Sequence, residues 1–368
     1  MTTALVTGFP TSFLAVRVLR ALVKQGDVGR VLCVVPAAFR TRADEELSKL
    51  EERERRRVEV LEGDIASIDM GLSGKEFLGL AAGVELIHHC AAITYLGVDR
   101  AIAEHVNVGG TREVLELAGA AKKLERIVHW STALISGTRS GLVLEDELEK
   151  PKAFRNVIEE TRFRGERLIR RASSRLPTTT LRPSVIVGDS HTGEIDRFEG
   201  PYLLLLLMLN APVDVRLPLP GRPDVPLNLV PIDYVIESGF AICADARSVG
   251  GTFHIVDPRP LPAKQVFELL AEAADRPRPR GFVPTNIASA ILRTPGIERF
   301  SQVPRAFLAQ LATDVIYDDR NARAVLDGQG PRCPSFDSYV RALVRFAREQ
   351  QKKKRHTRVT ELVDDPLG

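Results

Sequence analysis

The sequence predicts an α/β fold with a doubly wound parallel sheet and a smaller, mixed C-terminal lobe. Over the first half of the chain, short apolar runs rich in β-branched residues alternate with longer amphipathic segments, which is typical of a parallel sheet covered by helices. Prolines then become frequent from about residue 190, as in "APVDVRLPLPGRPDVPLNLVP". With 368 residues, of which 44% are hydrophobic, the chain can bury a core of this size.

Seven segments are expected as strands and four as helices. The expected strands are Ala4–Thr7, Arg30–Val35, Val58–Glu62, Leu86–His89, Arg126–Ser131, Thr178–Val187 and Gly251–Val256. The expected helices cover residues 13–25, 43–55, 101–121 and 157–175, where apolar residues recur at spacings of three and four. Such alternation requires right-handed crossovers and places ligands beyond the carboxyl ends of the strands.

The chain is expected to divide into a sheet domain, a lobe and a tail. We expect residues 1–190, with a further strand from about 228–256, to form the sheet domain, residues 191–348 to form the lobe, and residues 349–368 to form a basic, flexible tail. The run "LLLLLML" at 203–209 is too short to span a bilayer. It is expected as a core helix, with a lipid channel as the alternative.

The composition favours an ordinary soluble protein. A formal charge of +3, from 51 basic and 48 acidic residues, gives no electrostatic reason to expect nucleic acid binding, and the basic run "QQKKKRH" is expected as a solvated helix end. The four cysteines lie far apart without metal-ligand spacing, which favours buried thiols. The N-terminus enters an apolar strand without a basic leader, so we expect a cytoplasmic location and no transmembrane segment. A homodimer is left open.

The segment "ALVTGFPTSFLAVRVLRAL" predicts a strand, a tight turn beginning at Gly8, and a helix opened by Phe13. In this layout, backbone N–H groups and a helix N-terminus receive a pyrophosphate. The glycine pattern is poor, because Thr11 or Ser12 stands at the second glycine position and Ala15 at the third. The hydroxyl groups of Thr11 and Ser12 can themselves donate hydrogen bonds. A purely structural turn is the alternative to a dinucleotide site.

Two further loops carry candidate cofactor contacts. The segment after the second strand has no carboxylate for an NAD ribose, whereas Arg40 and Arg42 suit the additional phosphate of NADP, or are simply exposed arginines. Asp64 follows the third strand, where its carboxylate is expected to accept from an adenine amino group while Ile65 packs on the ring. A turn-forming aspartate is the alternative for Asp64.

The fourth expected strand ends in small residues, Ala91 and Ala92, which would let a cofactor lie close to the backbone. The preceding His88 and His89 alternate in direction along a strand, so we expect no metal site there. Asn107 opens or interrupts a helix, where a capping role is an equal alternative.

The motifs together resemble those of extended short-chain dehydrogenases/reductases over nearly the whole chain. They are Thr7-Gly8, Gly63-Asp64-Ile65, Ala91-Ala92, "NVGGT" at 107–111, "HWSTALISG" at 129–137 and "LRPSVIVGDSHTGEIDRFEGPY" at 181–202. The last segment is most similar to the bacterial branch that reduces thioesters and other acyl or polyketide-type substrates. The resemblance implies a Rossmann-type fold, a cofactor expected to be NADP, with NAD as the alternative, and a small hydrophobic or acyl substrate.

Residue by residue, the resemblance implies roles for five positions. Thr132 matches the hydroxyl that bonds the substrate carbonyl, and Pro183 and Val185 match the segment beside the nicotinamide. The tyrosine of the family's Y-x-x-x-K motif falls at Ile158, and its lysine falls at Arg162. Arginine keeps the charge and can bond the ribose, but it cannot share the proton chemistry of lysine.

Two functions therefore remain open. Without its acid, carbonyl reduction loses a step typically worth roughly 10²–10⁴-fold in rate. Tyr95 faces the substrate cleft in the family layout, and Glu159 stands beside the vacant position, but neither has the right spacing. The chain is either a reductase with a rearranged acid or a catalytically silent dinucleotide-binding protein that acts as a sensor or scaffold.

Overall fold

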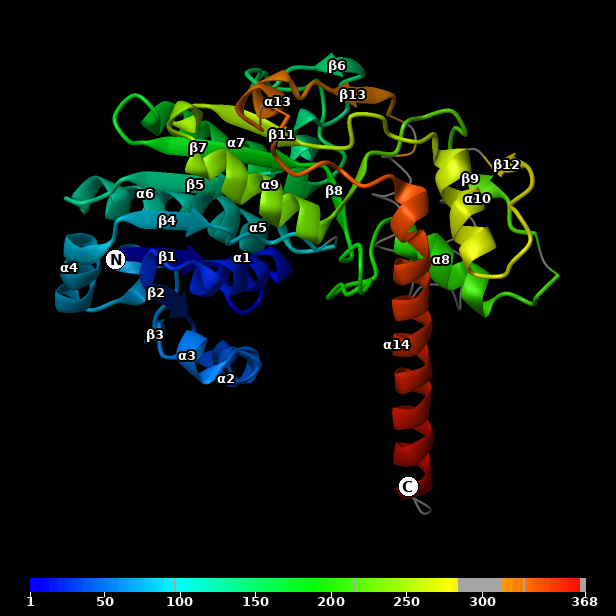
Figure 1. The fold of residues 1–368 in the computed structure, drawn as a ribbon, viewed down its shortest axis with the longest axis horizontal. Helices are drawn as coiled ribbons and strands as arrows, with labels where there is room; N and C mark the ends of the chain where they lie inside the picture. The colour runs from blue at the N-terminus through cyan, green and yellow to red at the C-terminus, as the bar shows by residue number, and fades with distance from the viewer. Residues whose placement is uncertain (96, 215, 284–310, 312, 327, 365–368) are drawn as a thin grey trace. The chain divides into compact units, whose positions relative to one another are not determined.

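The structure is a computed structural model, and its contacts divide the chain into two compact units (Figure 1). It describes residues 1–95, 97–214, 216–283, 311, 313–326 and 328–364. Unit 1 comprises Met1–Ser184, Val235–Pro258 and Val315–Pro331. Unit 2 comprises Val185–Tyr234, Arg259–Asp314 and Arg332–Gly368.

A parallel sheet forms the centre of unit 1, and the predicted α/β fold is confirmed. The strand order is β11-β7-β5-β4-β1-β2-β3, and each of the seven strands comes from one of the expected segments (Figure 1). The strands are β1 (Thr2–Thr7), β2 (Val28–Val35), β3 (Val58–Glu62), β4 (Leu86–His89), β5 (Arg126–Trp130), β7 (Thr178–Pro183) and β11 (Thr252–Ile255). Their carboxyl ends share one edge of the sheet, where ligands of such folds bind.

Helices cover both faces of the sheet. They are α1 (Phe13–Lys24), α2 (Arg40–Ser48), α3 (Glu52–Arg55), α4 (Gly74–Gly83), α5 (Arg100–Glu104), α6 (Thr111–Ala120), α7 (Val157–Ala172), α9 (Ile232–Ala244) and α13 (Arg320–Leu326). Consecutive residues of β4 identify the two faces: His88 stacks on Phe240 of α9, whereas His89 bonds to Thr111 of α6. A short parallel pair, β6 (Gly141–Val143) and β13 (Val315–Tyr317), completes unit 1.

Two of the expected helices are divided in the structure. The segment 43–55 forms α2 and α3, because Glu51 begins a new helix with a reciprocal capping box. The segment 101–121 forms α5, a π-helical stretch at His105–Gly110, and α6. Gly165 of α7 packs on this stretch, since a Cβ atom there would lie 2.5 Å from the carbonyl oxygen of Asn107.

The expected strand Thr178–Val187 is also divided. β7 ends at Pro183, which lacks the N–H that a sheet ladder requires. The next segment, β8 (Val185–Val187), pairs instead with β10 (Leu229–Pro231), and both belong to unit 2.

A buried ion pair links α7 to the sheet of unit 1. Nη2 of Arg182 lies 2.5 Å from Oε1 of Glu166, and the two side chains are only 1% and 2% exposed. Arg182 also donates to the carbonyl oxygens of Glu145 and Glu147 at 3.0 Å each. Glu166 in turn accepts a hydrogen bond from the hydroxyl of Ser131. The charges are thus surrounded by hydrogen bonds, as buried charges require.

Unit 2 has its own apolar core. Its helices are α8 (Pro201–Asn210), α10 (Ala263–Ala273) and α14 (Phe336–Asp364), and its second strand pair is β9 (Leu219–Pro220) with β12 (Phe282–Val283). The leucine-rich run lies in α8, where Leu205 and Met208 are buried with Phe267 and Leu343. It is therefore a core helix, as expected. Residues 349–364, expected as a tail, lie within α14.

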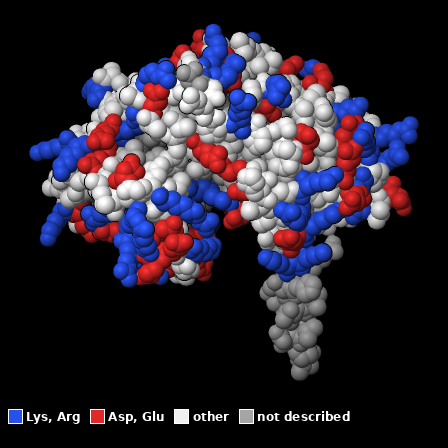
Figure 2. Space-filling model, viewed as in Figure 1, with Lys and Arg blue, Asp and Glu red and all other residues white. Residues whose placement is uncertain are grey.

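Charged side chains of both signs are interspersed over the visible face (Figure 2). Among the described residues, no helix is both long enough and apolar enough to cross a membrane.

We predict that Arg182→Met lowers the free energy of unfolding by about 3–5 kcal/mol, because Glu166 would remain buried without its cation. Urea denaturation followed by circular dichroism measures the change. The matched control is Arg247→Met. This substitution breaks the ion pair of Arg247 with Asp245, and because the Arg247 side chain is 64% exposed, the midpoint should barely shift. Equal midpoint shifts in both variants would contradict this account.

Candidate functional site

The turn between β1 and α1 is built around Gly8. Its φ angle is +89°, and a Cβ atom there would lie 2.8 Å from the backbone of Ala91. The Ala91 N–H also donates to the hydroxyl of Thr7 at 3.1 Å. The ends of β1 and β4 are therefore held in direct contact, and only glycine fits at position 8.

The hydroxyl groups of this turn already have partners. Thr11 donates to the carbonyl oxygen of Gly8 at 3.2 Å, and Ser12 caps α1 by accepting from the Ala15 N–H at 3.3 Å. Phe13 begins the helix, with the guanidinium of Arg17 5.1 Å from its ring centroid. A phosphate at this helix end would therefore meet the O–H of Ser12, the donor that its capping bond does not use.

The two loops that follow β2 and β3 are occupied by local contacts. Arg40 begins α2, about half exposed, with Nε 3.3 Å from Asp44, and Arg42 is exposed. Asp64 accepts from the N–H of Ala66 at 3.0 Å and from the hydroxyl of Ser67 at 3.4 Å. This is the turn-forming geometry of the alternative interpretation. Its neighbour Ile65 is 8% exposed and packs within the core.

A series of buried polar contacts connects β1 with α7. Nδ1 of His89 lies 2.9 Å from the hydroxyl of Thr7, and Nε2 lies 3.0 Å from that of Thr111. Asn107 lies inside the π-helical stretch rather than at a cap. It accepts from the Ile93 N–H at 2.8 Å and donates to Thr161 of α7 at 2.9 Å.

His129 is a buried residue that the sequence patterns did not single out. It is 3% exposed, and neither ring nitrogen has a partner among the described residues. Its ring stacks on that of His89 with centroids 5.3 Å apart. Burial, followed by the nearby charge of Arg162, holds the pKa of His129 well below its usual value. The register of β4 with β5 would have placed these two rings together, had the pairing been known.

α7 carries Ile158 and Arg162 one turn apart. Ile158 is 8% exposed and packs in an apolar cluster with Val98 and Ala103. Arg162 reaches the carbonyl oxygen of Trp130 at the end of β5, and burial lowers the pKa of its guanidinium to about 10. An alkyl group therefore fills the position at which the resemblance places the acid, while a buried cation stands at the carboxyl edge of the sheet.

The remaining candidates lie nearby in sequence but are engaged elsewhere. Glu159 is buried and accepts from Arg155 at 2.8 Å in an ion pair whose two side chains are each 3% exposed, so its carboxylate is engaged within the protein. Thr132 is half-buried, donates to the Pro183 carbonyl oxygen at 3.2 Å and accepts from the Leu134 N–H at 3.2 Å.

Three predicted residues stand apart from these contacts. Ala92 follows Ala91 and is half-buried, and Tyr95, in the loop after β4, is 37% exposed. Val185 opens β8 and belongs to unit 2. The described part of the chain contains no group of three or more histidine, cysteine or acidic side chains that could hold a metal ion.

A sequence model of the NAD-binding family described as "Male sterility protein" matches residues 6–238. The chain is 29% identical over 270 residues to a linear gramicidin synthase of Brevibacillus parabrevis, covering 69% of this chain and 5% of that protein. It is 28% identical over 263 residues to a carboxylic acid reductase of Segniliparus rugosus, and the match covers 63% of this chain and 22% of that protein. The chain thus spans only a small part of these curated relatives.

Solved structures share the fold. The terminal R domain of the myxalamid PKS-NRPS pathway superposes with a TM-score of 0.81 at 25% identity, covering 96% of this chain and 91% of that one. UDP-glucuronic acid 4-epimerase from Bacillus cereus, in complex with NAD, superposes with a TM-score of 0.67 at 20% identity. The match covers 95% of this chain and 99% of that one. The second likeness shows the fold alone.

We predict that acid destabilises this protein steeply below pH 6.5. Burial lowers the pKa of His88 and of His254 to about 3, and lowers those of His89 and His129 as well. The unfolded chain therefore binds protons below pH 6.5 that the folded chain does not, and each histidine costs about 1.4 kcal/mol per pH unit.

Urea midpoints measured between pH 7.5 and 5.5 test this prediction. His129→Phe should make the dependence shallower by about one proton, whereas His191→Gln, at an exposed position, should not change it. A midpoint that stays constant over this range, and an unchanged dependence in His129→Phe, would contradict the prediction.

Proposed function

We propose, from the premise that this chain belongs to the NAD-binding family described as "Male sterility protein", that it binds a dinucleotide but does not reduce carbonyl groups by the tyrosine-dependent route. The family is one of NAD(P)-binding reductases within the extended short-chain dehydrogenases/reductases. The finer choices of NADP as the cofactor and of a silent role are our proposal.

The packing of Ile158 carries this proposal. Hydride addition to a carbonyl leaves a developing alkoxide that needs a proton donor within about 3 Å. At the position of the expected donor stands an alkyl side chain in contact with Val98 and Ala103. The adjacent carboxylate, that of Glu159, is held by Arg155. Neither residue can deliver a proton at that position.

Other features of unit 1 fit a dinucleotide. The close contact with Ala91 excludes a side chain at position 8, where β1 meets the turn, and the N-terminus of α1 attracts a phosphate. Arg162 would hold the nicotinamide ribose, and Arg40 would meet the additional phosphate of NADP. A bound nicotinamide supplies or accepts a hydride. Arg162 keeps its positive charge throughout, because its pKa near 10 lies far above neutral pH.

A reductase with a rearranged acid is the second candidate. Thr132 supplies a half-buried hydroxyl at the end of β5, and Tyr95 supplies a partly exposed phenol. The names of the relatives, among them a carboxylic acid reductase and a fatty acyl-CoA reductase, favour an acyl or thioester substrate for this alternative. One of these two hydroxyl groups would then donate the proton.

We predict that the wild-type protein binds NADPH more tightly than NADH, and that Arg162→Ala weakens binding of both by about 1.5–3 kcal/mol, the contribution of hydrogen bonds to charged groups. Calorimetric titration of the full chain measures the affinities. The control is Arg164→Ala, which removes an arginine on the same helix that is 39% exposed and paired with Glu104. Absence of binding at about 1 mM of either cofactor would remove the dinucleotide from both candidates.

We predict little or no NADPH oxidation by the wild-type protein with simple aldehydes, ketones or acyl thioesters, measured by absorbance at the nicotinamide band. Ile158→Tyr combined with Arg162→Lys should create weak activity, because it restores the acid and the lysine beside it. Robust turnover by the unmodified protein would overturn the silent role. Its loss in Tyr95→Phe or in Thr132→Ala would then identify the replacement donor.

A further inference from the structure

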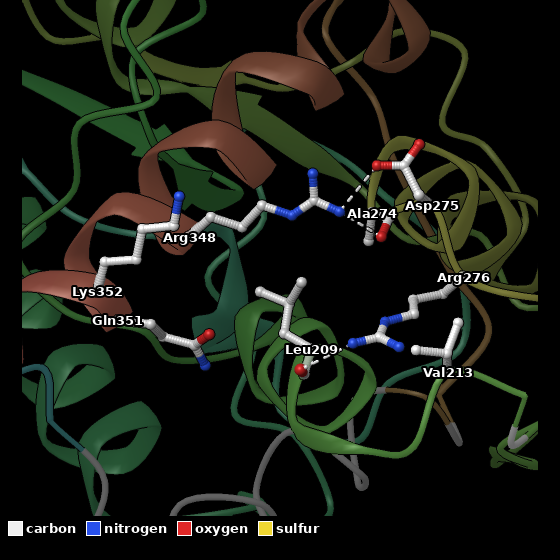
Figure 3. Close-up of a pocket in the computed structure, with 8 residues that line it drawn as sticks. All are labelled: Leu209, Val213, Ala274, Asp275, Arg276, Arg348, Gln351 and Lys352. Atoms are coloured by element: carbon white, nitrogen blue, oxygen red, sulfur yellow. Dashed lines mark hydrogen bonds and ion pairs between the residues drawn. The ribbon is translucent and has the colours of Figure 1, made fainter. Parts of the chain in front are cut away.

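A hollow in unit 2 is lined by basic side chains from two separate elements (Figure 3). Its volume is about 320 Å³. Arg348 and Lys352 come from α14, and Arg276 comes from the turn that follows α10. Leu209 of α8 and Val213 form the apolar part of the wall. Figure 3 shows the two guanidinium groups reaching toward the open space from different sides.

Both arginines are braced by main-chain carbonyl groups. Nη2 of Arg276 donates to the carbonyl oxygen of Leu209 at 3.1 Å. Nη2 of Arg348 donates to the carbonyl oxygen of Ala274, and to the carboxylate of Asp275 at 3.0 Å. The guanidinium groups are thus fixed before any ligand arrives, which reduces the entropy lost on binding.

Each guanidinium keeps donors that these contacts do not use. Nη1 of Arg276 is buried and has no partner among the described residues, and none of their carboxylates pairs with this arginine. The contacts of Arg348 use Nη2 alone, which leaves its Nε and Nη1 hydrogens. A buried cationic donor without an acceptor is costly, so this arrangement favours a further acceptor beyond those that the described residues provide.

The charge around the hollow determines which acceptor suits it. Among the described residues that line the hollow, Arg276 and Arg348 carry guanidinium groups and Asp275, whose side chain is 83% exposed, carries the one carboxylate. Guanidinium forks match the oxygen atoms of phosphates and carboxylates, and bonds to such charged acceptors are stronger than neutral ones. Beside them, Leu209 is half-buried and Val213 is 64% exposed, which provides apolar surface for a short stem.

We propose that unit 2 binds a small amphiphilic oxyanion, a phosphate monoester or carboxylate with a short apolar stem, in the hollow between Arg276 and Arg348. The head group accepts from the guanidinium of Arg276 and from the unused nitrogens of Arg348, and the stem lies against Leu209 and Val213. A volume near 320 Å³ suits a ligand of this size.

Titration of the full chain with inorganic phosphate, butyl phosphate and butyrate tests the proposal, with binding followed by calorimetry. Saturable binding with a Kd of about 1 mM or below is expected for butyl phosphate or butyrate, and the tighter of the two identifies the head group. Inorganic phosphate should bind more weakly than butyl phosphate, because it lacks the stem. No saturable binding of any of the three probes would overturn the proposal.

Variants locate the site. Arg276→Met and Arg348→Met should each weaken binding at least about 10-fold. Arg278→Met is the control, because Arg278 lies two residues after Arg276 and is paired with Glu272. Its loss should change the affinity less than about 2-fold. Val213→Glu leaves both arginines in place and should abolish binding by repulsion, even if an arginine variant fails to fold. Equal weakening by Arg278→Met, or unchanged binding in Val213→Glu, would place the anion elsewhere.

Discussion

The ion pair between Glu166 and Arg182 is the contact on which the layout of unit 1 depends. Arg182 sits in β7 and Glu166 in α7, and both side chains are almost fully buried. The carboxylate of Glu145, whose carbonyl oxygen accepts from Arg182, takes the N–H groups of His254 in β11 and Ala322 in α13. The guanidinium of Arg182 and the carboxylate of Glu145 together join β7, the neighbouring edge strand β11 and the helices α7 and α13.

The packing of α7 gives the substitutions at Ile158 and Arg162 their meaning. A mobile helix could turn another side chain toward the place where the resemblance expects an acid, but α7 is also held by Gly165 against the π-helical stretch and by Thr161 against Asn107. The side chain of Ile158 is therefore packed in a buried apolar cluster with Val98 and Ala103. Arg162, on the same helix, reaches the end of β5, where it donates to the carbonyl oxygen of Trp130.

The sequence predicted the sheet well because most of its strands are largely buried and rich in β-branched or apolar residues, although β3, with the exposed Glu59 and Glu62, is covered less completely. It predicted less where a local contact outweighs periodicity, as with the missing N–H of Pro183 or the new helix cap at Glu51. The candidate site divided in the same way. The small residues Gly8 and Ala91 could be singled out because close backbone contact demands them, and their role toward a cofactor stays a prediction. The burial of His129 depends on strand pairing, and the turn contacts of Asp64 depend on the neighbouring hydroxyl and N–H groups.

The division into two units has a consequence for synthesis of the chain. The polypeptide crosses between the units at five places, after residues 184, 234, 258, 314 and 331. When the ribosome has made β7, the sheet still lacks β11, its last strand, and β13 and α13 follow only after a second excursion into unit 2. Until then β7 is an uncovered edge, which is a template for pairing with other chains. Each unit is built from three separate segments of the chain, so neither unit can be produced by itself as one continuous fragment.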